Sequence, residues 1–441
     1  MGLASAIFAA VDGSAATRSI ADLAADPSGS TGWNVTVLAS RHAGEGMARD
    51  SMTFPSTAVR STRTVSPTTS TFTTSDTVQA PRRADTKPSA ALTAGVAVLF
   101  ALNAKYIHSS LAPWCLLAGV EAAGPAGVCA EVREGTVNEP ERDVLARILD
   151  GEPDAVLFSC YLWNIRETLR LAAAVKAARP GAYVVLGGPE VSYNAGEVLA
   201  ENPQVDYILS GEGERSVPML LASLAAGRKP EEEAPPIPGL CARGFLSAPC
   251  VEEGAPPSPY APAYLENLRG RIAYLETSRG CPYACAFCLS GRCGKPRWFP
   301  LEQAKRNILT LARSGAHTVK FIDRTFNAKP AHANAILAFI LKHYGRDIPA
   351  GVCFHFELAG DILREETFAL LEQAPPGAFQ LEIGMQSFCE KTLAAVRRKT
   401  DTGVLKQNIR RLVAMGNMHV HIDLIAGLPH EDLRTFGESF N

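Results

Sequence analysis

Three cysteines stand close together in the string GCPYACAFC, which contains Cys281, Cys285 and Cys288. Three thiolates can occupy three corners of a [4Fe-4S] cube, and the fourth iron then keeps an open coordination site. An open iron can bind an external amino and carboxylate group, whereas a cluster with four protein ligands suits electron storage. The spacing therefore predicts a cluster that also binds a small molecule. Phe287, directly before the last cysteine, is expected to pack against this cluster and exclude water.

A zinc site is the alternative for the same segment. Cys293 supplies a fourth thiolate within thirteen residues, and four thiolates can form a closed tetrahedral site. Usual zinc sites contain two CxxC pairs, and the CxxxC step found here is not that pattern. The other cysteines are expected to be small buried hydrophobic residues, namely Cys115, Cys129, Cys160, Cys241, Cys250, Cys353 and Cys389.

The elements before the cysteines must form a sheet, because apolar runs of strand length alternate with helical patterns. The expected strands lie at 95–102, 127–132, 154–159, 182–187 and 205–210, and the expected helices at 109–124, 140–150, 164–181 and 215–227. Asn164 is expected to cap the third of these helices. The alternation predicts five parallel strands with helices on both faces, in flavodoxin-like order.

A second α/β unit follows a Pro-rich stretch. Five strand-and-helix repeats between 271 and 429 are typical of a TIM-type barrel, in which the loops after the strands build the active site. The cysteines directly follow the first of these strands. A sixth strand is not found before the sequence ends, so we expect a partial barrel and a truncated sequence. The expected division is 1–90 disordered extension, 91–228 first domain, 229–265 linker and 266–441 barrel.

Composition narrows the classes of function. A formal charge of -2 over 441 residues gives no field that would attract nucleic acid. The longest apolar stretch, Ala91 to Leu102, is too short to span a membrane. A chain this long needs no disulfide bonds, so we expect reduced thiols in a soluble, cytoplasmic protein. Acidic residues in the first fifty positions speak against a transit peptide, although organelle targeting stays open.

The segment YLETSRGCPYACAFC resembles the cluster-binding segment of the radical S-adenosylmethionine (SAM) superfamily, whose members cleave SAM reductively. The strings FIDRTFN, FHFEL, LEIGMQSF and HIDLIAGLP resemble successive strand ends in its coproporphyrinogen-dehydrogenase-like branch. The resemblance implies SAM contacts by Glu357, Gln386, Arg398 and Asp423. Asp423 could equally cap a helix or accept from backbone donors. IDRTFN stands where that branch usually has a Gly-Gly-Glu stretch, which is absent here.

Residues 95–227 resemble the Rossmann-like cobalamin-binding domain of one radical SAM branch, through the stretches LGGPEVS and VDYILSGEGE. The resemblance implies a cobalamin near Ser159, Gly187 and Gly188, although the two glycines could simply make a tight turn. The cobalt-ligating DxHxxG motif is absent. His108 lies in the corresponding loop without the required aspartate and glycine, so we expect it to be structural or to face the substrate.

The residues and the resemblance together predict a radical SAM enzyme with a [4Fe-4S] cluster and SAM. The same hypothesis includes an unknown substrate and an electron donor such as flavodoxin or ferredoxin. It also includes cobalamin-dependent methyl transfer. The alternative is a non-catalytic zinc- or corrinoid-binding regulatory module. Methylthiotransfer to RNA is not expected, because Cys115, Cys129 and Cys160 are spread over separate elements.

Overall fold

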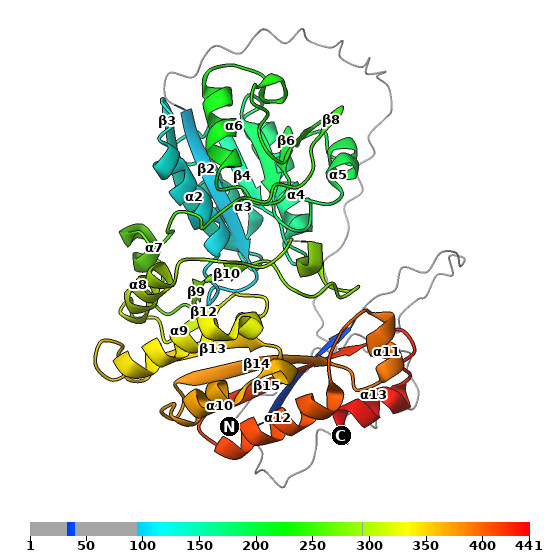
Figure 1. Ribbon diagram of the computed structural model, residues 1–441. Helices are drawn as coiled ribbons and strands as arrows, with labels where there is room; N and C mark the ends of the chain where they lie inside the picture. Colours follow the sequence, from blue (N-terminus) through cyan, green and yellow to red (C-terminus); the bar gives the residue numbers. More distant parts are fainter. Residues whose placement is uncertain (1–32, 40–94, 293) are drawn as a thin grey trace, which may run out of the picture. The chain divides into compact units, whose positions relative to one another are not determined.

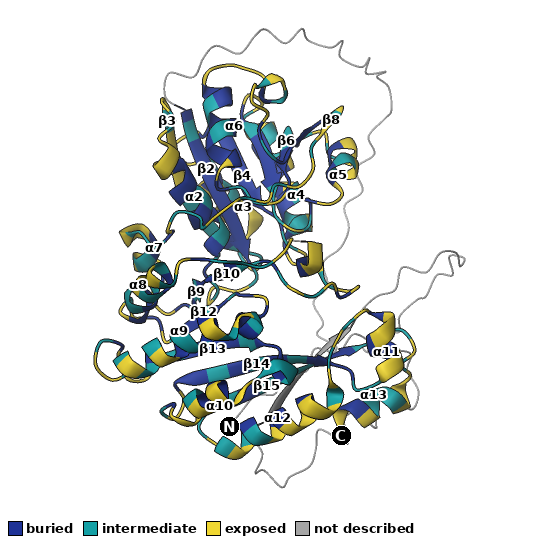
Figure 2. Cartoon of the chain, viewed as in Figure 1, coloured by how far each residue is buried: buried dark blue, intermediate teal, exposed yellow. Residues whose placement is uncertain are grey.

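Two sheets organise the described part of the chain, which comprises residues 33–39, 95–292 and 294–441, the first of these segments as backbone only (Figure 1). The computed structural model places both sheets in one compact unit. Their central strands are buried, as Figure 2 shows. Apart from 33–39, the extension at 1–90 that was expected to be disordered lies outside the described residues. None of the described helices has the length and apolar character needed to span a membrane.

The first sheet has the flavodoxin-like order that the sequence predicts. Its parallel strands follow the order β3-β2-β4-β5-β6, in which the chain starts in the middle and reverses direction once. They are β2 (Gly95–Asn103), β3 (Val128–Thr136), β4 (Ala155–Ser159), β5 (Tyr183–Gly187) and β6 (Tyr207–Leu209). Ligands in such sheets bind outside the carboxyl ends of the strands, where the order reverses.

Helices cover both faces of this sheet, as expected. Alternate side chains of β2 point to opposite faces, so Val98 and Phe100 join one apolar cluster and Ala97 and Leu99 join another. The first cluster includes α3 (Glu141–Leu149), α4 (Ile165–Ala178) and α5 (Ala195–Glu201), and the second includes α2 (Leu111–Ala123) and α6 (Ser216–Ala225).

The segment expected to be a linker contributes to the first sheet. β7 (Leu240–Ala242) pairs antiparallel with β6, and β8 (Phe245–Leu246) pairs antiparallel with β7. Leu240 and Cys241 are buried there. The proline content hides this hairpin from sequence analysis, because short antiparallel edge strands tolerate nearby prolines. The rest of the segment holds η1 (Pro230–Glu232) and α7 (Pro262–Glu266).

The second sheet is an open half-barrel of parallel strands in the order β1-β15-β14-β13-β12-β9. Its strands are β9 (Ala273–Leu275), β12 (Thr318–Phe321), β13 (Cys353–Leu358), β14 (Phe379–Gln386), β15 (His419–Ala426) and β1 (Trp33–Ala39). β1 differs from the expectation, since residues before 90 were placed outside the fold. Its backbone pairs with β15, whose free edge offers unpaired N–H and C=O groups.

The half-barrel is apolar on its outer face and polar on its inner face. Phe354 and Phe356 pack outward with the helices, whereas the alternate residues His355 and Glu357 point inward. The helices are α8 (Leu301–Ala312), α9 (Pro330–His343), α10 (Glu365–Glu372), α11 (Glu390–Ala395), α12 (Thr402–Met415) and α13 (Leu433–Phe440), with short turns η3 (Phe326–Ala328) and η4 (Gly360–Ile362). A polar inner face is what an occupied barrel interior requires.

A glycine sets the turn after β5. Gly188 has a φ of 101°, and an added Cβ would lie 2.5 Å from the carbonyl oxygen of Cys160. Gly187 accepts a hydrogen bond from the Cys160 N–H at 2.7 Å. The loops after β4 and β5 therefore touch through their backbones, and only glycine at position 188 permits this contact.

Gly188→Ala is expected to lower the free energy of unfolding by about 2 kcal/mol or more, since it combines a strained φ with a backbone clash. Urea unfolding of the full chain measures the change. Gly181→Ala is the matched control, because Gly181 precedes β5 at an exposed position with nothing within 4 Å of an added Cβ. An equal effect of both substitutions would contradict this account.

Candidate active site

The cysteine loop is closed at its base by a two-stranded ladder. β10 (Ser278–Arg279) pairs antiparallel with β11 (Arg297–Trp298), so the ends of the loop lie side by side. Between them the chain forms a single short helix, η2 (Leu289–Arg292), among the described residues. The loop therefore depends on contacts with the rest of the protein for its shape.

Each of two cysteines contacts a side chain from another strand end. The Sγ of Cys281 lies 3.6 Å from the Oγ1 of Thr325, and the Sγ of Cys285 lies 3.9 Å from Nη1 of Arg398. Cys285 is buried, Cys281 and Cys288 are half-buried, and Phe287 is 37% exposed. The half-barrel thus surrounds the predicted cluster ligands with polar groups from its second and fourth loops.

Among the described residues, which leave out Cys293, no group of three or more His, Cys, Asp or Glu side chains is gathered closely enough to hold one metal ion. In an iron-sulfur cube each thiolate binds a different iron, so the thiols stand farther apart than the ligands of a single zinc ion. The zinc alternative that uses Cys293 lies outside the described residues.

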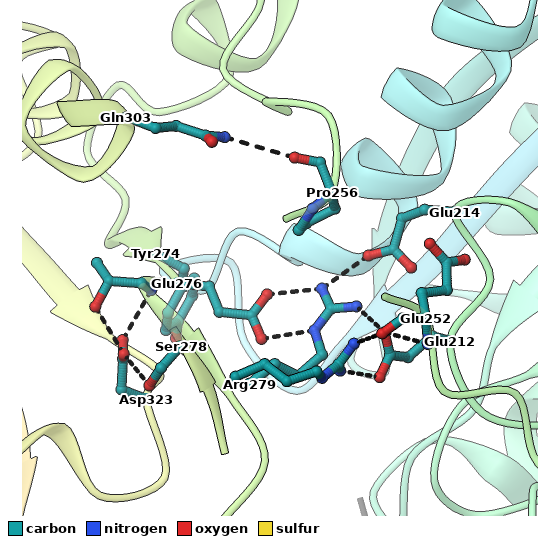
Figure 3. Close-up of polar contacts among 12 residues, drawn as sticks. Glu212, Glu214, Glu252, Pro256, Tyr274, Glu276, Ser278, Arg279, Gln303 and Asp323 are labelled. Atoms are coloured by element: carbon teal, nitrogen blue, oxygen red, sulfur yellow. Dashed lines mark hydrogen bonds and ion pairs between the residues drawn. The ribbon is translucent and has the colours of Figure 1, made fainter. Parts of the chain in front are cut away.

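Asp323 forms hydrogen bonds with the strand that leads into the cysteine loop. Its carboxylate accepts hydrogen bonds from the Thr277 N–H at 3.0 Å, the Thr277 hydroxyl at 2.7 Å and the Ser278 hydroxyl at 2.5 Å (Figure 3). Burial raises the pKa of Asp323 to about 6, although the hydrogen bonds from Ser278 and Thr277 oppose this shift. The IDRTFN stretch, which departs from the family pattern, therefore supplies a structural carboxylate here.

Gln386 and Arg398 lie together next to Gly384, and Arg398 also contacts Cys285. Arg398 donates to the carbonyl oxygen of Gly384 through Nη2, and its Nη2 and the Gln386 Nε2 both approach that glycine. Among the described residues, Gln386 Oε1 and Arg398 Nε are buried without a hydrogen-bond partner. Buried unpaired polar atoms are costly, so a donor and an acceptor left open at one place fit a polar ligand.

Glu357 and Asp423 belong to an ionic cluster on the inner face of the half-barrel. Lys320 lies 3.3 Å from Glu357 and 2.9 Å from Glu382, and His355 lies 2.9 Å from Glu382. Burial and the charges of Glu382 and Glu357 raise the pKa of Asp423. Although burial acts to raise the pKa of Glu382, the contacts with His355 and Lys320 lower it overall. Glu357 is therefore already paired, while protonation of Asp423 is shifted to a higher pH than is usual for an aspartate.

The predicted cobalamin residues lie at the carboxyl edge of the first sheet. Ser159 ends β4 opposite Gly187 of β5, and both are followed by the touching loops described above. Aromatic side chains stand on these loops: the rings of Tyr161 and Trp163 stack with centroids 4.5 Å apart, and Trp163 is 51% exposed. Asn164 lies at the start of α4, but its side chain does not cap the helix. Its Oδ1 instead accepts a hydrogen bond from the Tyr161 N–H at 2.8 Å, within the loop after β4.

His108 joins the first domain to the half-barrel. Its Nδ1 lies 2.7 Å from the hydroxyl of Tyr274 on β9, and burial lowers the pKa of this histidine. Arg271, just before β9, binds the carbonyl oxygen of His108 and the carboxylate of Glu134. His108 therefore has a structural role in the described fold.

A second ionic contact joins the domains next to the cysteines. Arg279 binds Glu276 of its own strand end together with Glu212 and Glu214 of the loop after β6 (Figure 3). Burial acts to lower the pKa of Arg279, but Glu276 and Glu214 raise it overall. The GEGE stretch of the first domain thus reaches the base of the cysteine loop.

Family models match both halves of the chain. A model of the B12 binding domain matches residues 98–221, and a model of the radical SAM superfamily matches residues 275–441. The chain belongs to the B12-binding branch of the radical SAM superfamily. The resemblance stated from the sequence and the fold class are thereby confirmed.

Relatives of this radical SAM protein include methyltransferases. The chain is 29% identical over 310 residues to 2-(S-pantetheinyl)-carbapenam-3-carboxylate methyltransferase of Streptantibioticus cattleyicolor, which covers 65% of this chain and 44% of that protein. It is 28% identical over 304 residues to the cobalamin-dependent radical SAM methyltransferase TokK of Streptomyces tokunonensis, with the same coverage. The chain spans about half the length of the curated relatives it matches.

Solved structures share the fold of this radical SAM protein. TsrM from Kitasatospora setae, a radical SAM methyltransferase, aligns with a TM-score of 0.61 at 18% identity, covering 78% of this chain and 70% of that chain. The cobalamin-dependent SAM radical enzyme OxsB aligns with a TM-score of 0.63 at 19% identity, covering 79% and 51%. At these identities the likeness concerns the fold alone.

Some residues of the radical SAM protein were not found from the sequence. Asp323 and Thr325 follow β12, whereas Lys320 lies within β12 and Glu382 within β14; position in or after a strand was the available signal, but their contacts depend on neighbouring strands. The prediction that the other cysteines are buried is confirmed for Cys115, Cys160 and Cys241. It is wrong for Cys129, which is exposed on the edge strand β3, and Cys250, Cys353 and Cys389 are only partly buried.

Asp323→Asn is expected to remove a pH dependence of stability. Because the pKa of Asp323 is about 6 in the folded protein and 3.8 in its reference state, the folded state binds this proton more tightly. The native protein should therefore lose about 3 kcal/mol relative to the variant as the pH rises from about 4 to about 7.

Urea unfolding at pH 4 and pH 7 measures this difference. Glu197→Gln on the exposed side of α5 is the control, and its difference from the native protein should not change between the two pH values. A difference for Asp323→Asn that is constant or of opposite sign would refute the assignment.

Proposed function

We propose that the chain forms the core of a cobalamin-dependent radical SAM enzyme that transfers a methyl group to an unidentified substrate. The observation that carries the proposal is the placement of Arg398 against Cys285 and of Gln386 with Arg398 against Gly384, each with a buried unpaired atom. Such an arrangement supports a bound cluster with a polar ligand next to it.

Cys281, Cys285 and Cys288 would hold the [4Fe-4S] cluster. When bound, the cluster supplies the electron that cleaves SAM, and it receives that electron from a donor such as flavodoxin or ferredoxin. Thr325 and Arg398 contact two of the thiols and would stabilise the negative charge of thiolate sulfur. Phe287, at 37% exposure, is available to cover the cluster.

Arg398 and Gln386 would orient SAM. The guanidinium can pair with the methionyl carboxylate, and the amide oxygen of Gln386 can accept from the amino group. The raised pKa of Asp423 allows this group to donate a hydrogen bond on the inner face, and Glu357, which pairs with Lys320, can accept one. These two groups are suited to ribose hydroxyls as acceptor and donor.

The rim of the first sheet would bind cobalamin without a histidine ligand. Gly187 and Gly188 place no side chains at the carboxyl edge of the first sheet, here called the rim. Ser159 pairs with Gly187 at this edge. Exposed aromatic and apolar residues of the same rim offer a surface for a large flat ring, namely Tyr106, Ile107, Leu162, Trp163 and Tyr193. His108 is bound to Tyr274 and does not serve as a cobalt ligand in this proposal.

Relatives described as methyltransferases and a hopanoid C-3 methylase from Methylococcus capsulatus favour methyl transfer as the outcome. The direct test is anaerobic reconstitution with iron, sulfide and cobalamin, followed by assays for 5'-deoxyadenosine and for a bound-corrin spectrum. A protein that carries the cluster but yields no 5'-deoxyadenosine with a strong reductant would count against SAM cleavage. A protein without a bound-corrin spectrum would count against the cobalamin part.

Cys285→Ala is expected to abolish both the visible absorbance of the cluster and the cleavage of SAM, because two thiolates cannot hold the cube. Iron and sulfide analysis after reconstitution measures the loss. Cys129→Ala removes an exposed thiol on β3 and serves as the control, which should keep full iron content. Retention of a complete cluster by Cys285→Ala would refute the ligand assignment.

Arg398→Gln is expected to weaken SAM binding roughly tenfold or more, since it removes a charge-assisted hydrogen bond. Equilibrium dialysis of the reconstituted protein with SAM gives the dissociation constant. Arg410→Gln, an exposed position of α12, is the control and should bind like the native protein. Unchanged affinity for Arg398→Gln would contradict its assignment to the SAM carboxylate.

A further inference from the structure

Both ends of the cysteine loop carry an arginine. Arg279 ends β10 and Arg297 begins β11, and the two residues are register partners in the ladder that closes the loop. Like charges directly opposite one another in an antiparallel pair repel. The base of the loop is therefore stable only if a negative group lies between the two guanidinium groups.

Glu212 of the first domain supplies that group. One of its carboxylate oxygens lies 3.1 Å from Nη1 of Arg279, and the other binds Nη2 of Arg297. The side chains are 12% exposed for Glu212, 18% for Arg279 and 21% for Arg297, so water screens these contacts only weakly. One carboxylate thus holds both ends of the loop at once.

Neighbouring carboxylates complete the arrangement. Arg279 also binds Glu214 at 2.7 Å, and Glu276 at 2.9 and 2.7 Å, as Figure 3 shows. Arg297 donates to the carbonyl oxygen of Glu252, whose N–H in turn donates to Glu212 at 3.3 Å. Glu212 and Glu214 follow β6, the last parallel strand of the first sheet, and Glu252 follows β8 of the same sheet, so the negative side of the contact comes from the first sheet and its loops.

The backbone between Arg279 and Cys281 is tightly packed. Gly280, which separates Arg279 from Cys281, has a φ of 98°, and an added Cβ would lie 2.8 Å from the carbonyl oxygen of Lys295. The chain therefore passes directly over the returning strand of the loop. A displacement of Arg279 must be transmitted to Cys281.

We infer that Glu212 is a positioning residue that clasps both ends of the cysteine loop, so that the arrangement of the three thiols depends on the contact with the first domain. The inference rests on the proposed function insofar as these thiols bind the cluster. It assigns to the GEGE stretch a role at the cluster site that is separate from cobalamin binding.

The chain offers a matched control in the other ionic contact between the two domains. Glu134 of β3 pairs with Arg271, which precedes β9, and the Glu134 side chain is 11% exposed; neither residue belongs to the ladder that closes the cysteine loop. Glu134→Gln and Glu212→Gln therefore remove equally buried interdomain charges. Only Glu212→Gln should affect the cysteine loop.

Hydrogen exchange of the full chain without cofactors tests the clasp. In Glu212→Gln, amides of residues 280–292 should exchange roughly tenfold faster or more, because Arg297 loses its ion pair with Glu212 and the carboxylate that joins it to Arg279 is removed, although Arg279 keeps Glu214 and Glu276. In Glu134→Gln, these amides should exchange at the native rate. Arg279→Lys, which cannot span Glu212 and Glu276 together, should give an intermediate rate and provides the test should Glu212→Gln not fold.

The electron paramagnetic resonance spectrum of the reduced cluster supplies a second measurement. It should change in Glu212→Gln and match the native spectrum in Glu134→Gln. Native exchange of 280–292 in Glu212→Gln, or the same acceleration in Glu134→Gln, would overturn the inference. A native chain that takes up no iron would instead overturn the proposed cluster, since the exchange result does not require iron.

Discussion

The site depends on a loop with little secondary structure being held at its base by buried carboxylates. Asp323 binds Thr277 and Ser278, where the chain enters the cysteine loop. Glu212 binds Arg279 and Arg297, the arginines at the two ends of that loop. A carboxylate can accept several hydrogen bonds at once, so each one fixes more than one group. Removing a buried charge leaves its partners uncompensated, which makes these contacts cooperative.

The half-barrel separates stability from chemistry by strand alternation. Its outer residues, such as Phe321, Phe354 and Phe356, form the core with the helices. Its inner residues form the ionic cluster of Lys320, Glu382 and Asp423. Successive side chains of a strand point to opposite faces of the sheet, so the charged residues and the core residues lie on different faces. The polar face can therefore carry opposed charges without disturbing the packing.

The two domains meet at the carboxyl edge of the first sheet through loops that carry function. The loop after β2 places His108 against Tyr274, and the loop after β6 places Glu212 and Glu214 against Arg279. Both loops lie at the carboxyl ends of parallel strands, where an open α/β sheet gathers its functional loops. The rim is thus both a candidate cofactor surface and the connection to the cysteine loop.

Much of this protein could be predicted from the sequence alone, because apolar runs and the cysteine spacing are local signals. The strands β2, β4 and β5, the flavodoxin-like order and the cysteine triad follow from such patterns. The β7–β8 hairpin and β1 were missed, since pairing at a sheet edge depends on which backbone groups are left free elsewhere. Only the tertiary structure decided that IDRTFN provides a structural carboxylate, that Gly188 accommodates Cys160 and that Glu212 joins Arg279 to Arg297. These contacts link residues far apart along the chain. Which residues pair depends on their distance and burial in the folded protein, and a local sequence pattern contains neither.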